Sequence, residues 1–175
     1  MNQAAPAQPR TGGFCAVVEF PAMRVGVRTR AEELAEICFL PRSIALVAPK
    51  NRLAERAARQ FERYRRDPDS GFDLPLAEVG TAFQRRVWEV IASIPRGRTL
   101  SYGEVARRLR SAPRAVGQAC GANWFPLVIP CHRVVGASSL GGFGHHGEGF
   151  HLEIKSWLLR HECCPIGHQR VPTRA

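Results

Sequence analysis

The sequence predicts a mixed α/β (α+β) protein, in which a small N-terminal antiparallel sheet with one helix precedes a mostly helical C-terminal part. Three observations predict this class. Residues 14–46 hold short runs of alternating apolar residues, the pattern of half-buried strands. From residue 51 onward, apolar residues recur mainly at helical spacing. The length of 175 residues is enough for one ample core, or for two small cores that share an interface.

Three short strands are expected in the N-terminal part. Residues 15–20 and 25–29 alternate on either side of a turn at residues 21–24, and a third run at residues 35–40 closes at Pro41. Short strands separated by turn signals indicate a small antiparallel sheet.

One helix should follow and pack on this sheet. Asn51 can cap it, and it should end before residues 67–71, which are rich in Asp, Pro and Gly. Its apolar positions recur at helical spacing: Leu53, Ala57, Phe61 and Tyr64. We therefore expect an N-terminal domain at residues 14–71. Residues 72–80, which include Pro75, should form an extended linker to a second domain.

The C-terminal domain, expected at residues 81–163, should open with a helix that Thr81 caps. Its apolar face comprises Phe83, Val87, Ile91 and Ile94. A third helix should begin at Ser101, because Ser101 and Glu104 have the spacing of a capping box.

A fourth helix, from Arg114 to about Gly121, should follow a tight turn at residues 111–113. Two short helices joined by such a turn form a helix-turn-helix. The fourth helix is built of very small residues, and only Arg114 and Gln118 are long and polar. Such a slim helix suits a narrow groove and has few side chains that read base edges. Close packing against another helix is the alternative interpretation.

The last element expected is an amphipathic helix from about Phe150 to residues 161–162. It should bury Leu152, Ile154, Trp157 and Leu158. A Gly-rich loop at residues 137–149 precedes it and should be mobile. Residues 1–13 are interpreted as a flexible leader and residues 164–175 as an irregular tail.

The charge of the chain suggests a polyanionic partner. The formal net charge is +10, although a generally Arg-rich composition is the alternative explanation. Between residues 81 and 136 only Glu89 and Glu104 are acidic. Nine arginines lie in the same segment: 85, 86, 96, 98, 107, 108, 110, 114 and 133. Most of the positive charge is therefore concentrated there.

The cysteines and the N-terminus indicate a cytoplasmic protein. The six cysteines form no C-x-x-C pair, and Cys163 and Cys164 are adjacent, which is a poor geometry for an ordinary disulfide. Free thiols fit a reducing compartment. Residues 1–13 lack the apolar block of a secretory signal, and no apolar run approaches the ~18 residues of a membrane span.

One cysteine stands in an unusual context, Ile129-Pro-Cys-His-Arg-Val134. A thiol with a pKa of about 8.5 needs a base or positive surroundings to become a nucleophile, and His132 and Arg133 are candidates for both. Neighbouring residues of an extended strand point to opposite faces. Either the backbone turns sharply at Pro130 and Cys131, or a water connects the thiol and the imidazole. For Cys15, Cys38 and Cys120 a structural role is expected.

Further motifs stand in the C-terminal part of the sequence, in the order Phe83-Gln-Arg-Arg-Val-Trp88, Ile94-Pro95, Thr99-Leu-Ser-Tyr102, Arg114-Ala-Val-Gly117, Asn123, Ile129-Pro-Cys-His-Arg-Val134 and Lys155-Ser-Trp-Leu-Leu159 with Glu162. Together they resemble the O6-alkylguanine-DNA alkyltransferases, also called methylated-DNA–protein-cysteine methyltransferases, in matching order from Thr81 to Glu162. The resemblance is specific, because Pro-Cys-His-Arg-Val, with its cysteine eight residues after Asn123 and Arg-Ala-Val-Gly upstream, is a compound signature. It implies a ribonuclease-H-like N-terminal domain and a winged-helix-like C-terminal domain.

The resemblance also implies an activity: irreversible, single-turnover transfer of the alkyl group of O6-alkylguanine in duplex DNA to Cys131. His132 would be the water-mediated base, Glu162 the carboxylate that orients it, and Tyr102 the donor of a proton to the departing guanine. Arg114 would replace the flipped base in the stack. The other expected DNA contacts are Ser101, Ala115, Gly117, Gln118 and Arg133. The expected residues of the pocket and its turn are Asn123, Pro130, Val134, Val135, Gly136 and Phe143.

These expectations include a monomer that binds the minor groove of double-stranded DNA largely without sequence preference, with no cofactor and no metal. Trp124, in place of the family's usual proline, and the long His-rich loop at residues 141–150 depart from the pattern. One alternative is a lesion sensor of the alkyltransferase-like class, but such proteins lack the acceptor cysteine. The other alternative is a zinc protein. Its ligands would be Cys131, Cys163, Cys164, His145, His146 and His151, but their spacing fits no standard zinc site.

Overall fold

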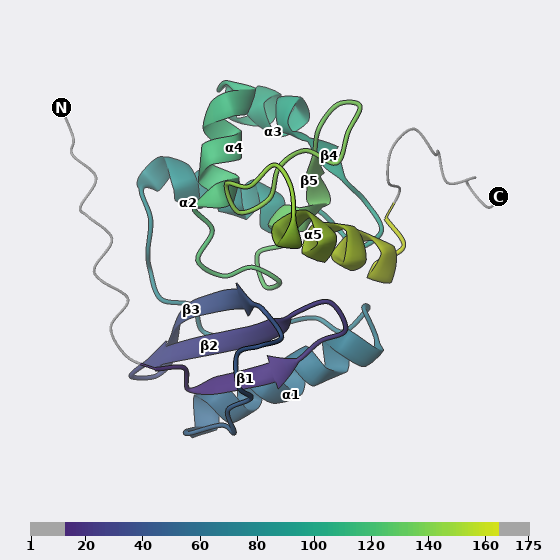
Figure 1. The fold of residues 1–175 in the computed structure, drawn as a ribbon. Coiled ribbons are helices and arrows are strands. Elements are labelled where there is room, and N and C mark those ends of the chain that lie inside the picture. Colours follow the sequence, from purple (N-terminus) through teal and green to yellow (C-terminus); the bar gives the residue numbers. More distant parts are fainter. Residues whose placement is uncertain (1–12, 165–175) are drawn as a thin grey trace.

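The N-terminal sheet forms as expected in the computed structural model, which describes residues 13–164. Strands β1 (Ala16–Glu19), β2 (Arg24–Arg30) and β3 (Glu33–Leu40) form an antiparallel sheet in the order β1-β2-β3 (Figure 1). Val17 lies opposite Gly26, and Gly26 lies opposite Cys38. The expected tail at residues 164–175 lies outside the described residues except for Cys164, and the expected leader lies outside them except for Gly13.

Helix α1 (Arg52–Arg66) covers one face of this sheet (Figure 1). Asn51 caps it as predicted, because its side chain accepts a hydrogen bond from Ala54 N at 2.8 Å. The predicted apolar face is buried against the sheet. The expected linker pairs with the start of β3, since Leu34 N donates to Pro75 O and Ala77 N donates to Leu34 O.

The C-terminal part contains the predicted helices. Helix α2 (Ala82–Ala92) has a capping box of Thr81 and Gln84, and α3 (Tyr102–Leu109) has one of Ser101 and Glu104. Helix α4 (Pro113–Gly121) follows α3 after a tight turn, which gives the predicted helix-turn-helix. A two-stranded parallel sheet of β4 (Leu100–Ser101) and β5 (Val134–Val135) was not anticipated.

The final helix α5 spans Phe150–His161 as expected, but its buried face differs from the prediction. Ile154 and Leu158 are buried, whereas Leu152 and Trp157 are only half-buried. Their places in the core are taken by Lys155 and Leu159. Trp157 instead stacks on His161, with ring centroids 4.7 Å apart. The face of α5 that meets the core is therefore rotated from the one that apolar residues alone indicated.

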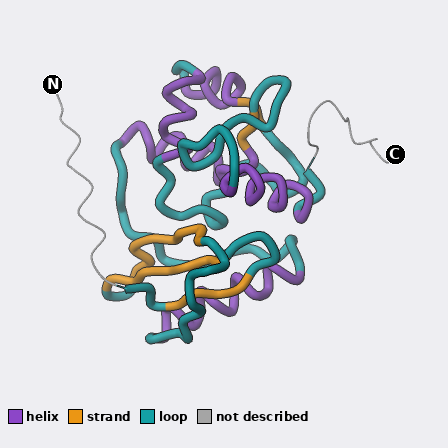
Figure 2. The backbone as a smooth tube through the Cα atoms, in the orientation of Figure 1, coloured by secondary structure: helices purple, strands orange, loops and turns teal. Residues whose placement is uncertain are grey.

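The helical part lies next to β3, at one edge of the sheet (Figures 1 and 2). Ile37 N of β3 donates to Trp124 O at 2.9 Å, and Phe39 contacts Phe143 with ring centroids 5.7 Å apart. Much of this contact is made by loops of the helical part (Figure 2). No helix among residues 13–164 is long and apolar enough to span a bilayer.

Candidate active site

Cys131 is buried at the start of a sharp turn. It is the first residue of a 3-10 helix, η1 (Cys131–Arg133), and its side chain is 5% exposed. The backbone therefore turns at this point, which was one of the two possibilities left by the sequence. Asn123 spans the turn: its Nδ2 donates to Ile129 O at 2.8 Å, and its Oδ1 accepts from Phe125 N at 2.9 Å. This placement fits the expectation that Asn123 belongs to the turn that holds the cysteine.

The imidazole of His132 is buried beside a carboxylate. Its Nε2 lies 3.0 Å from Glu162 Oε1, and the side chain is 1% exposed. Within residues 13–164, Nδ1 has no hydrogen-bond partner, and the contact of Nε2 with Glu162 is close without the alignment of a regular hydrogen bond. Burial lowers the pKa of His132, and the Glu162 carboxylate opposes that shift. The free imidazole is therefore neutral at physiological pH, with Nδ1 able to accept a proton when Nε2–H donates to Glu162.

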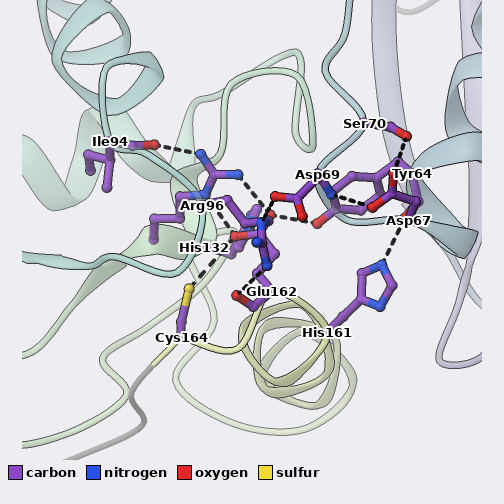
Figure 3. A network of polar contacts seen from close by, with 11 residues as sticks. Tyr64, Asp67, Asp69, Ser70, Ile94, Arg96, His132, His161, Glu162 and Cys164 are labelled. Carbon is purple, nitrogen blue, oxygen red and sulfur yellow. Dashed lines mark hydrogen bonds and ion pairs between the residues drawn. The ribbon is translucent and has the colours of Figure 1, made fainter. Parts of the chain in front are cut away.

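Glu162, directly after α5, is the centre of a buried polar network (Figure 3). Tyr64 OH donates to Oε1 at 2.6 Å, and Arg133 donates from Nε to Oε2 at 2.8 Å and from Nη2 to Oε1 at 2.9 Å. The Cys164 thiol lies 3.7 Å from Oε2. Burial by itself raises the pKa of Glu162, but the hydrogen bonds from His132, Arg133 and Tyr64 outweigh burial and hold it well below its usual range. Glu162 is therefore a permanent carboxylate.

The structure places Arg133 differently from the expected DNA contact. Its guanidinium forms a bidentate pair with Glu162, and Nη1 donates to Ile94 O at 2.5 Å. The side chain is only 13% exposed. An arginine with these partners is not available to phosphates, so Arg133 belongs to the carboxylate network.

A cavity of about 320 Å³ lies between Cys131 and the helix-turn-helix. The same cavity reaches Pro113 near the exposed start of α4. Its wall is formed by α3, α4, η1 and the Gly-rich loop. The lining residues are Tyr102, Pro113, Gly117, Gln118, Cys120, Gly121, Cys131, Gly142, Phe143, Gly144 and His145. The thiol of Cys131 is thus connected to the surface of the helix-turn-helix.

Of the predicted pocket residues, only Phe143 lines this cavity. Val134 and Val135 form strand β5, and Val135 pairs with Ser101. Gly136 packs against Ser139, and Pro130 precedes the turn of η1. The prediction that Val134, Val135 and Gly136 line the pocket was wrong for this cavity, because the chain turns away into the small parallel sheet.

Lys155 is a site residue that the sequence reasoning missed. It is fully buried, and its Nζ donates to Val134 O at 2.7 Å and to Gly142 O at 2.9 Å. Burial lowers its pKa to about 8, and the nearby thiols of Cys131 and Cys120 raise it. Positions 155, 158, 159 and 162 share one helical face. A lysine on an otherwise apolar stripe that leads to Glu162 was the signal that could have revealed Lys155.

The lysine bears directly on the reactivity of Cys131. Burial raises the pKa of the Cys131 thiol, whereas a hydrogen bond with Asn123 and the charge of Lys155 lower it. The ammonium group of Lys155 is therefore a local source of positive charge for the thiolate.

Tyr102 lies in the cavity wall, and its hydroxyl donates to Gly142 O at 2.9 Å. Burial raises the pKa of Tyr102, so the phenol stays protonated.

The predicted DNA contacts differ in exposure: those on α4 are exposed or half-buried, and Ser101 caps α3. Arg114 and Gln118 are exposed, Ala115 and Gly117 are half-buried, and Gly117 and Gln118 also line the cavity. Ser101 is engaged with Glu104 through its hydroxyl and its backbone N–H, as the cap of α3.

Comparison with known proteins adds to this geometry. A family model described as 6-O-methylguanine DNA methyltransferase, DNA binding domain, matches residues 82–164. A methylated-DNA–protein-cysteine methyltransferase of Methanosarcina acetivorans is 42% identical over 108 residues, which are 61% of this chain and 67% of that protein. The matched segment thus spans about two thirds of that relative.

Solved structures match over a greater length. The Mycobacterium tuberculosis O6-methylguanine methyltransferase superposes with a TM-score of 0.71 at 30% identity, over 90% of this chain and 94% of that one. The M. tuberculosis OGT in complex with DNA superposes with a TM-score of 0.69 at 30% identity, over 83% of this chain and 90% of that one. These matches include the N-terminal sheet as well as the helical part.

Proposed function

Since this chain belongs to the 6-O-methylguanine DNA methyltransferase family, as its sequence resemblance predicted, we propose that it repairs O6-alkylguanine in duplex DNA by moving the alkyl group to Cys131. One observation carries the proposal. The cavity that begins at the helix-turn-helix ends at a thiol whose neighbour His132 is paired with a buried carboxylate.

Thiolate formation follows from the geometry of the network. The neutral His132 offers Nδ1 as the acceptor of the Cys131 proton, and one bridging water would satisfy this buried nitrogen as well as the thiol. The imidazolium that forms is stabilised by Glu162 across 3.0 Å. Tyr64 and Arg133 fix the carboxylate in that position, and Lys155 stabilises the thiolate.

The transfer itself is a displacement at carbon. The thiolate sulfur forms a bond to the alkyl carbon, the bond from this carbon to O6 breaks, and its electron pair stays with guanine. Tyr102, which stays protonated and lines the cavity, donates a proton to the departing base in this proposal. The product thioether leaves no free thiol, so each molecule reacts once.

DNA binding is assigned to α4 and its surroundings. The helix carries small residues and an exposed Arg114 at its start, which fits insertion into the minor groove with Arg114 in the place of the flipped base. Few side chains of α4 reach base edges, so binding is largely independent of sequence. The described residues of a single chain supply both the thiol network and the cavity wall, which supports a monomer.

Intact mass after incubation with O6-methylguanine duplex tests the proposal. We expect one added methyl group in the wild-type protein and none in Cys131→Ser. The matched control is Cys120→Ser, which removes the other thiol of the cavity and should still be methylated. Tight DNA binding with an unchanged mass would overturn the proposal in favour of a lesion sensor.

A further inference from the structure

His145 lies in the cavity wall but has no role in the proposed reaction. It occupies the tip of a tight turn closed by two hydrogen bonds, from Phe143 N to His146 O at 2.8 Å and from His146 N to Phe143 O at 2.9 Å. Its φ of 67° lies in the left-handed region, which favours glycine. A histidine in this conformation is held there by its surroundings.

The ring of His145 packs directly on Gly121 at the end of α4. A Cβ atom added to Gly121 would lie 2.7 Å from His145 Nε2 and still closer to Nδ1 and Cε1. No side chain at position 121 leaves room for the ring. Because both residues line the cavity and His145 is exposed to solvent, their contact forms a solvent-exposed part of the cavity wall, here called the cavity mouth.

The turn that carries His145 is anchored on both sides. Gly142 O accepts hydrogen bonds from Tyr102 and Lys155, and the buried Phe143 packs on Phe39 of the sheet. On the other side the His146 ring stacks on His151 of α5, with centroids 4.0 Å apart. The ring of His145 is therefore presented to Gly121 by a fixed turn.

We propose that His145, seated on Gly121, limits the size of the O6-alkylguanine that can reach Cys131. This inference rests on the proposed function and adds a specificity-determining residue to it. A methyl adduct passes the narrowed mouth, whereas a bulky adduct meets the ring. Removing the ring should widen the mouth without touching the Cys131, His132 and Glu162 network, which lies on other elements.

The test compares single-turnover rates toward two duplexes of the same sequence, one with O6-methylguanine and one with O6-benzylguanine. In His145→Gly we expect the benzyl-to-methyl rate ratio to rise at least tenfold. Glycine suits the positive φ, so the turn should be kept. The matched control is Glu148→Gly at an exposed position of the same loop, which does not line this cavity and does not anchor the turn, and it should leave the ratio unchanged.

A second variant tests the contact itself. Gly121→Ala must displace the ring in the wild-type background and should change the rate ratio, but it should have no effect in the His145→Gly background. If the wild-type protein transfers methyl groups, two results would overturn the inference about His145. One is an unchanged rate ratio in His145→Gly, and the other is additive effects of the two substitutions on that ratio. Absence of methyl transfer in the wild-type protein would instead refute the proposed function.

Discussion

The hydroxyl of Tyr64 donates a 2.6 Å hydrogen bond to Glu162 Oε1. The two residues are 98 positions apart, one near the end of α1 and the other directly after α5. Tyr64 also contacts His161, with ring centroids 5.3 Å apart. The helix that covers the N-terminal sheet thus takes part in holding the carboxylate that faces His132 (Figure 3). Packing between the two parts of the chain and the chemistry at Cys131 are therefore coupled.

Tyr64→Phe should weaken both stability and reaction. The substitution removes one donor from a buried carboxylate, and hydrogen bonds to charged groups contribute roughly 1.5–3 kcal/mol. Urea unfolding should show a decrease of this size in the free energy of unfolding. Methyl transfer should slow several-fold, because Glu162 Oε1 is held less firmly. Tyr102→Phe is the control for stability, since its hydroxyl meets only a loop carbonyl and its loss should cost less. Equal stability of Tyr64→Phe and wild type would contradict the coupling.

Glu162→Gln should be more severe, because it leaves the buried Arg133 guanidinium without its counter-charge. Breaking such a pair costs roughly 3–5 kcal/mol. The pKa of Glu162 is lower in the folded state than the roughly 4.3 of an unfolded glutamate. The contribution of the Glu162 carboxylate to the free energy of unfolding is therefore fully present above about pH 4.3 and is lost as the pH falls below that value.

Stability measured from pH 7 down to pH 3 checks the prediction for Glu162. The wild type should lose stability over this range more steeply than Glu162→Gln. The exposed Glu55, 55% accessible at its side chain, provides the control, and Glu55→Gln should follow the wild-type curve. Parallel curves for Glu162→Gln and wild type would exclude a depressed pKa.

Arg114→Ala should impair base extrusion and spare the thiol. Extrusion costs a few kcal/mol, and 1.4 kcal/mol corresponds to tenfold in rate, so we expect a loss of roughly tenfold or more toward duplex DNA. Transfer from the free base O6-methylguanine, which needs no extrusion, should be unchanged. Arg63→Ala on α1, which lies beyond the sheet from α4 (Figure 1), is the matched control. Loss of both activities in Arg114→Ala would show a structural role instead.

Local signals in the sequence predicted most of the fold. Asn51, Thr81 and Ser101 each cap a helix as expected, because a cap depends only on residues within one turn. The parallel pair of β4 and β5 escaped prediction, since each strand has only two residues and its partner lies more than thirty positions away. Such short strands carry no periodic pattern.

The candidate site was only partly predictable for a related reason. Cys131 and His132 stand in one motif, and the resemblance added Glu162 from the end of α5. The orientation of Arg133 toward Glu162 and the arrival of Tyr64 depend on tertiary packing that no local pattern encodes. Lys155 escaped prediction because a lysine adds nothing to an apolar pattern, although it shares the buried face of α5 with Leu158 and Leu159.

Lys155→Met should slow methyl transfer at pH 7, because the Cys131 thiolate loses its nearby positive charge. The pKa of Lys155 is about 8, so the wild-type protein loses the same charge as the pH rises past that value. The rate advantage of wild type over Lys155→Met should therefore be largest at neutral pH and shrink above pH 8. Single-turnover rates from pH 6.5 to 9.5 measure it.

Stability should respond to Lys155 in the same pH range. An unfolded lysine has a pKa of about 10.4, so the unfolded state binds the proton more tightly than the folded state does. The burial cost of the charged lysine is present below pH 8 and is relieved as the pH rises from 8 toward 10.4. Wild type should thus gain stability relative to Lys155→Met over this interval. The control is Lys50→Met at an exposed lysine, which should show neither the rate effect nor the stability effect. If the rate advantage of wild type over Lys155→Met stayed constant with pH, the charge of Lys155 would be ruled out as its cause.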